Sequence, residues 1–86
     1  MNLIDWYIER EKKCLDGKPY LTDHYINIMK SDPDYIKKSL MDNLDHDITL
    51  AIRSCELTED IDINSGNKDE FVNEIFDAIK KEFIKD

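Results

Sequence analysis

Hydrophobic residues recur at helical spacing in four segments of the chain, separated by residues that end or start helices. The first segment covers about residues 3–16. Gly17 follows it in the position of a left-handed residue, and Pro19 is expected to block continuation of the helix. A short second helix is predicted over about residues 22–30. Its apolar residues lie nearly all round, so we expect it to be the most enclosed helix.

The third segment has the clearest start, because Asp32 can cap a helix whose first position is Pro33, where a missing N–H costs nothing. One apolar face continues from there to about residue 55. Residues 43–45 are the place where a kink could occur. The face does not shift there, so the pattern predicts one helix or two collinear ones.

The helical period breaks over residues 57–66. Residues 60–63 alternate between polar and apolar, but a single four-residue strand has no partner in this chain, so we expect a loop. Asn67 with Glu70 is a capping-box signature and starts the last helix. The stripes together predict this core: Leu3, Tyr7, Ile8, Tyr25, Met29, Leu40, Leu44, Ile48, Ile52, Phe71, Ile75, Ile79 and Phe83.

Composition supports a helical fold. The chain has 86 residues, of which 41% are hydrophobic and 37% charged, with two glycines and two prolines. Strand-rich proteins need more turn residues than that. We therefore predict an all-α fold: residues 1–86 form one small four-helix bundle with an acidic loop before the last helix.

Negative charge is concentrated in one part of the sequence. The chain has a formal net charge of −8. Residues 45–66 contribute −5 of it, with six carboxylates against one base: Asp45, Asp47, Glu56, Glu59, Asp60 and Asp62 against Arg53. Such a field favours a basic partner or a cation and repels nucleic-acid phosphate.

The polar side of the third helix and the loop after it form a candidate partner-binding surface. An ordinary exposed helix mixes both signs of charge, whereas this one carries a single base. The expected surface comprises Asp42, Asp45, Thr49, Leu50, Arg53, Glu56, Glu59, Asp60 and Asp62, with Leu50, Ile61 or Ile63 as its apolar centre. The alternative is that this side is only a solvated helix back.

Two residues of the first helix depart from its pattern. Trp6 lies away from the apolar stripe, so it either packs against a second neighbour or serves as an exposed anchor for a partner. We keep it among the candidate binding residues. Glu11 falls inside the stripe and is expected to reach solvent or to meet a base such as Lys18.

A calcium site is poorly supported by the spacing of its ligands. Oxygen side chains alternate from Asp60, as in an EF-hand loop, which needs glycine at its sixth position and a bidentate glutamate at its twelfth. Counting from Asp60, those positions hold Ser65 and Phe71. His24 and His46 lack further ligands at recognisable spacing. We expect no metal and no cofactor.

No catalytic motif accompanies the cysteines, histidines or hydroxyl groups, so we expect a protein that is not an enzyme. Basic residues do not cluster, which disfavours direct nucleic-acid binding. The first residues do not form a signal peptide, and no apolar run reaches the length of a membrane span. Cys14 and Cys55 fall on apolar helix faces and are expected to be reduced thiols in the cytoplasm.

These observations predict an acidic helical interaction module, monomeric or homodimeric, that inhibits or modulates a partner by binding its basic surface. It could block a nucleic-acid-binding groove. Small acidic helical proteins recur among nuclease immunity proteins and viral inhibitors, which is an analogy of class only. The alternatives are a structural or regulatory subunit that forms a homodimer, and a weak calcium-binding domain.

Overall fold

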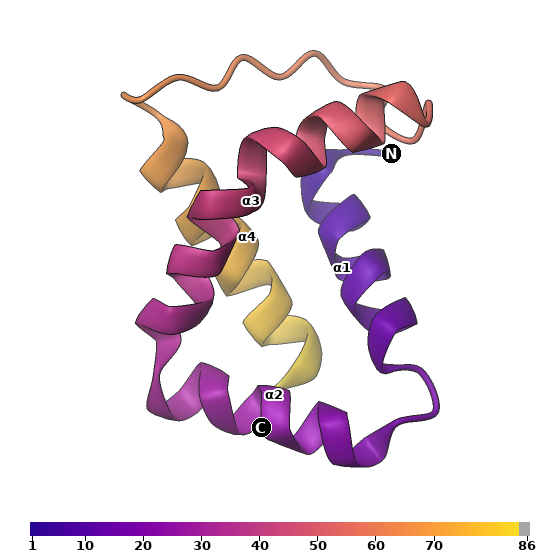
Figure 1. The fold of residues 1–86 in the computed structure, drawn as a ribbon, viewed down its shortest axis with the longest axis vertical. Helices are drawn as coiled ribbons and strands as arrows, with labels where there is room; N and C mark the ends of the chain where they lie inside the picture. Colours follow the sequence, from indigo (N-terminus) through magenta and orange to yellow (C-terminus); the bar gives the residue numbers. More distant parts are fainter. Residues whose placement is uncertain (85–86) are drawn as a thin grey trace.

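Four α-helices make up the fold of residues 1–84, the part of the chain that the computed structural model describes (Figure 1). Their bounds are α1 Leu3–Leu15, α2 Pro19–Ser31, α3 Pro33–Arg53 and α4 Lys68–Phe83. No strand occurs within these residues. The predicted all-α, four-helix fold is confirmed.

The predicted helix boundaries hold at three of the four helix starts. Gly17 has a φ of +70°, as expected of the left-handed residue after α1. Pro33 is the first residue of α3, and Asp32 forms the whole connection between α2 and α3. The prediction is wrong for the start of the second helix, which lies at Pro19 rather than at about residue 22. Pro19 begins α2, because the first position of a helix has no intrahelical bond for the missing N–H to lose.

The helices enclose a core along the longest axis of the molecule, which extends 34 Å. In Figure 1, α1, α4 and the first half of α3 run along this axis, while α2 lies across one end. The second half of α3 and the loop after it cross the other end. Thus α3 is one helix, as one of the two predicted alternatives had it, but it changes direction near its midpoint. Asn43 Nδ2 donates to the Ser39 carbonyl at 2.8 Å in this region, a side-chain bond of the type that accompanies helix bending.

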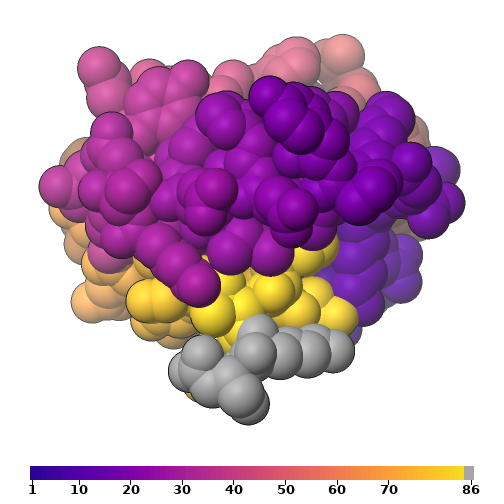
Figure 2. Space-filling view, turned by 90° about the horizontal axis from the view of Figure 1, so that it is seen from below, coloured from indigo at the N-terminus to yellow at the C-terminus, as the bar shows by residue number. Residues whose placement is uncertain are grey.

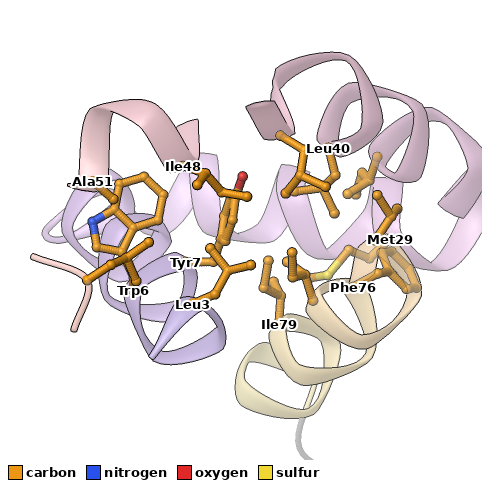
Figure 3. Close-up of a cluster of buried hydrophobic side chains, with 14 residues drawn as sticks. Leu3, Trp6, Tyr7, Met29, Leu40, Ile48, Ala51, Phe76 and Ile79 are labelled. Carbon is orange, nitrogen blue, oxygen red and sulfur yellow. The ribbon is translucent and has the colours of Figure 1, made fainter. Parts of the chain in front are cut away.

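The core contains residues from all four helices (Figure 3). Leu44, Ile75 and Ile79 are fully buried at its centre. Of the predicted core residues, Leu3, Tyr7, Met29, Leu40 and Ile48 are buried as well. Four others pack on the core while only partly buried: Ile8, Tyr25, Phe71 and Phe83. Ile52 is a wrong prediction, because 51% of it is exposed.

Helix α2 is the least buried helix rather than the most enclosed. Only Met29 is buried, while Tyr20 is 80% exposed and Leu21 44% exposed. Figure 2 shows the reason, since α2 lies across one end of the molecule with its outer side open to solvent. A helix in that position can bury only one side, whatever the distribution of its apolar residues.

The loop between α3 and α4 is attached to the core by its apolar side chains. Leu57 is buried, and Ile61 and Ile63 are half-buried against the core. These two isoleucines therefore use most of their apolar surface for the fold, and only the remainder is open to a partner. Asn67 makes no capping bond to α4, contrary to the predicted capping box. Its amide instead donates to the Asp62 carbonyl at 2.8 Å and accepts from the Asn64 N–H at 2.9 Å, which fixes the loop.

Candidate partner-binding surface

The predicted surface residues lie at the bend of α3, on the second half of this helix and in the loop after it, which together form one end of the molecule (Figure 1). We call this region the acidic end. Its members are all solvent-exposed: Asp42, Asp45, Thr49, Leu50, Arg53, Glu56, Glu59, Asp60 and Asp62. Five of the nine lysines within residues 1–84 lie at the other end, on α2 or on the last turns of α1 and α4: Lys12, Lys13, Lys30, Lys80 and Lys81. The local concentration of acid in the sequence is therefore also local in space.

Three carboxylates at the acidic end carry no partner. Within residues 1–84, the side chains of Asp42, Asp60 and Asp62 form neither a hydrogen bond nor an ion pair. Asp45 is paired with Lys68 of α4 at 3.2 Å, but its side chain is 73% exposed. An ion pair that is so exposed to water contributes little to stability. The three free carboxylates are thus the groups at this end available to a cationic partner without any loss inside the fold.

Glu56 and Glu59 are engaged with α1 instead. Glu56 Oε2 accepts a hydrogen bond from the indole Nε1 of Trp6 at 2.8 Å. Glu59 Oε1 accepts from the Leu3 backbone N–H at 2.6 Å, so a carboxylate sits at the positive end of the α1 dipole. Both residues fasten the loop to α1. Their carboxylates therefore stabilise the attachment of the loop to α1.

Trp6 is not an exposed anchor, because only 7% of it is accessible. Its ring contacts Tyr7 edge-on with centroids 5.0 Å apart, and the Arg10 guanidinium lies over it at 5.2 Å. Figure 3 shows the indole on the side of the core near Ala51 of α3. The structure therefore supports the second-neighbour alternative for this residue.

Leu50 is 45% exposed and Ile52 51% exposed on the second half of α3. Both are among the few large apolar side chains that reach solvent. Leu50 remains a candidate apolar contact for a partner, and Ile52 joins it. Apolar contacts of this kind set how long a complex lasts more than how fast it forms.

Asp47 is a buried carboxylate whose burial was not predicted from the sequence. It belongs to the acidic segment of residues 45–66, but it is 5% exposed and lies on the side of α3 that contacts α1. Its two oxygens bind Tyr7 Oη at 2.9 Å and Arg10 Nη1 at 2.8 Å. Each carboxylate oxygen of Asp47 has a partner on α1. This cluster is therefore a connection between two helices rather than a reactive site.

Protonation at this cluster follows from burial and from the charge of Asp47. Burial raises the pKa of Tyr7 far above its ordinary value, and the neighbouring Asp47 carboxylate raises it further. The hydrogen bond to Asp47 raises the pKa of Arg10. Burial also raises the pKa of the half-buried Glu11, against the attraction of Arg10. Of the two alternatives for Glu11, the pairing with Lys18 is not formed, and Lys18 Nζ donates to the Cys14 carbonyl at 3.3 Å.

The helical spacing of the buried α3 residues is the sequence signal that could have predicted the burial of Asp47. The buried stripe of α3 runs through Leu40, Leu44, Asp47 and Ala51, at intervals of four, three and four. An acid at such a position needs partners, and Tyr7 supplies one. At about 100° per residue, Ile52 lies roughly 110° from the centre of this stripe, which explains its exposure.

The described residues hold no metal-binding cluster. No group of three or more His, Cys, Asp and Glu side chains within residues 1–84 is arranged to hold a metal ion. Asn64 Oδ1, a potential ligand of the loop, accepts from the Gly66 N–H at 2.8 Å. Cys14 and Cys55 are free thiols and both are exposed, so neither lies on a buried face as predicted. Cys55 follows the end of α3 with a φ of +57°.

No helix within residues 1–84 has both the length and the apolar character needed to cross a lipid bilayer. Comparison with known proteins adds no relative. No family model matches the chain, and no curated protein and no solved structure matches it significantly.

Proposed function

We propose that this protein is an acidic helical interaction module that binds a basic surface of another protein and thereby inhibits or modulates it. The observation that carries the proposal is the set of three exposed, unpaired carboxylates, Asp42, Asp60 and Asp62, at one end of the molecule. Leu50 lies exposed on the second half of α3, at the same end of the molecule. Two exposed free thiols fit a cytoplasmic location, where thiols stay reduced.

Unpaired charge exposed at one end of the molecule suits this role. A carboxylate that already has an internal partner must lose it before binding, whereas these three lose only water. Summed over one end of a small protein, their field steers a positively charged surface into contact and increases the association rate. A groove that binds nucleic-acid phosphate is such a surface. A module bound in such a groove would inhibit the protein to which the groove belongs. We propose no catalytic role.

The test combines capture of the partner with binding kinetics. A pull-down from the native host at low and high salt supplies the partner, and the rates are then measured with purified proteins. The variant Asp42→Lys/Asp60→Lys/Asp62→Lys should associate much more slowly at low salt. The loss should shrink near 1 M salt, where the screening length falls from about 8–10 Å to about 3 Å. Leu50→Ala should instead increase the dissociation rate at every salt concentration.

The matched control reverses three exposed acids outside the acidic end, Asp16, Asp23 and Asp77, and so changes net charge equally. It should reduce the association rate less. An equal reduction in both triple variants would show that only net charge matters. Unchanged rates in the first variant would contradict the proposal.

A homodimeric structural subunit is the second candidate. It is favoured by the exposure of two large aromatic side chains near the opposite end, Tyr20 at 80% and Tyr35 at 64%. Sedimentation equilibrium of the wild type beside Tyr20→Ser/Tyr35→Ser separates the candidates. A dimer abolished by these changes would favour the subunit, and a monomer would exclude it. The calcium alternative has no support in residues 1–84, which contain no suitable ligand cluster.

A further inference from the structure

We propose that a groove between the first turns of α1 and α4 receives a lysine or arginine side chain of the partner. The groove has a volume of about 350 Å³. Its apolar lining, which we call the floor, consists of Leu3, Ile4 and Phe71. Its charged lining, which we call the rim, consists of the carboxylates of Asp5, Glu59 and Glu74, and Asn2 completes the groove. This inference rests on the proposed function and names the anchor that the same binding would use.

The floor accounts for the shape of the ligand. Ile4 and Phe71 are half-buried, so each keeps apolar surface that a ligand can cover, while Leu3 is buried beneath. A lysine or arginine side chain buries its methylene stem on apolar surface and holds its charged head at the edge. A purely apolar side chain would match the floor but would leave the three rim carboxylates without compensation.

The rim accounts for the charge of the ligand. Asp5 and Glu74 are exposed, and within residues 1–84 their carboxylates form no hydrogen bond or ion pair. Glu59 uses Oε1 for the Leu3 N–H at 2.6 Å, which leaves its second oxygen open. No lysine, arginine or histidine lines the groove. The three carboxylates are not arranged to hold a metal ion together. A guanidinium or ammonium group at the rim can instead form an ion pair with any one of them.

The groove also lies where a partner bound to the acidic end would reach it. Glu59 belongs to both regions and is followed directly by the free carboxylate of Asp60. In Figure 1, the first turns of α1 and α4 and the loop between α3 and α4 occupy the same end of the molecule. One basic surface can therefore contact the free carboxylates and place a side chain in the groove.

The experiment uses an octa-arginine peptide as a defined probe, with an octa-citrulline peptide as its uncharged counterpart. A two-dimensional NMR titration of the full chain should move the backbone amides of Ile4, Phe71 and Glu74 with the first peptide only. Asp5→Asn/Glu74→Gln should weaken the affinity roughly two- to thirtyfold, the range that two exposed ion pairs give. These neutral isosteres preserve size, and Glu74→Gln alone serves if the change in the first turn of α1 impairs folding.

The control is Glu9→Gln/Asp77→Asn, which removes the same charge from exposed positions on the same two helices. It should leave the groove shifts in place and change the affinity less. Shifts confined to the acidic end, or equal losses in both double variants, would overturn the groove while leaving the proposed function standing. Absence of binding anywhere on the protein would contradict both.

Discussion

The acidic end and helix α2, which lies across the opposite end, are attached to the rest of the molecule by different kinds of interaction. At the acidic end, carboxylates bind α1: Glu56 the Trp6 indole, Glu59 the Leu3 N–H, and Asp47 both Tyr7 and Arg10. At the other end, α2 is attached by apolar contacts, with Met29 buried and Tyr25 edge-on to Phe83 at 5.8 Å. Within residues 1–84, no side chain of α2 makes a hydrogen bond or ion pair to another helix.

The acids at one end therefore have two roles, which only the structure separates. Those bound to α1 stabilise the fold, whereas Asp42, Asp60 and Asp62 have no internal partner within residues 1–84 and stay available to a partner. A charge reversal chosen from the sequence alone would combine both kinds. Reversing Asp45, Glu56 and Glu59 together, for example, would weaken folding and binding at once.

The largest effect is expected at α2, which is attached by packing alone. Met29→Ala removes a side chain that is 1% exposed and the only buried one of α2, and it should cost roughly 2–5 kcal/mol. Leu44→Ala, at a fully buried position in the middle of the core, is the reference and should fall in the same range. Urea denaturation followed by circular dichroism measures both. A cost well under 1 kcal/mol for Met29→Ala would show that α2 is not held by packing.

The next effect concerns the buried carboxylate at the acidic end. Asp47→Ala leaves the Tyr7 hydroxyl and the Arg10 guanidinium without their acceptor, and it should cost about 1–3 kcal/mol. The penalty stays below that of a fully buried pair, because the Arg10 side chain is 42% exposed and can turn to water. Asp47→Asn, which retains an acceptor oxygen, should cost less. Equal stability of the wild type and Asp47→Ala would show that the two helices are joined by packing here too.

A smaller effect is expected from the carboxylate at the start of α1. Glu59→Gln keeps an acceptor for the Leu3 N–H but removes the charge from the helix dipole, which should cost about 0.3–1 kcal/mol. Asp60→Asn, next to it and without a partner, should change stability by less than about 0.5 kcal/mol. Thermal unfolding at low and high salt measures both, and the difference should diminish at high salt. Identical values would place Glu59 among the free carboxylates.

Sequence reasoning identified the elements because their signals are local. Gly17 and Pro33 act through their own backbone preferences, so the end of α1 and the start of α3 were predicted correctly. Pro19 shows the limit of this reasoning, since the same residue can end one helix or begin another. Which of the two occurs depends on where the chain has space to continue.

The candidate surface was only partly predictable, because a carboxylate's partner comes from elsewhere in the chain. The exposure of Asp42, Asp60 and Asp62 followed from their position opposite the apolar face and in the loop. The bonds of Glu56 and Glu59 to α1 join residues 50 and 56 positions apart, a separation at which no sequence pattern acts.

The smallest effect tests whether acid near the core is ever unfavourable to this fold. Burial raises the pKa of Glu11 in the folded protein above its ordinary value of 4.5. The folded state therefore holds this proton more tightly than the unfolded state. The resulting stability is fully present below pH 4.5 and is lost as the pH rises through the folded-state pKa. Glu11→Gln should match the wild type near pH 4 and be more stable at pH 7. Urea unfolding across this range measures the difference, with Glu9→Gln, exposed on the same helix, as the control that should show little pH-dependent gain. A variant less stable than the wild type at pH 7 would mean that attraction to Arg10 outweighs burial, and Glu11 would then join the carboxylates that fasten the acidic end.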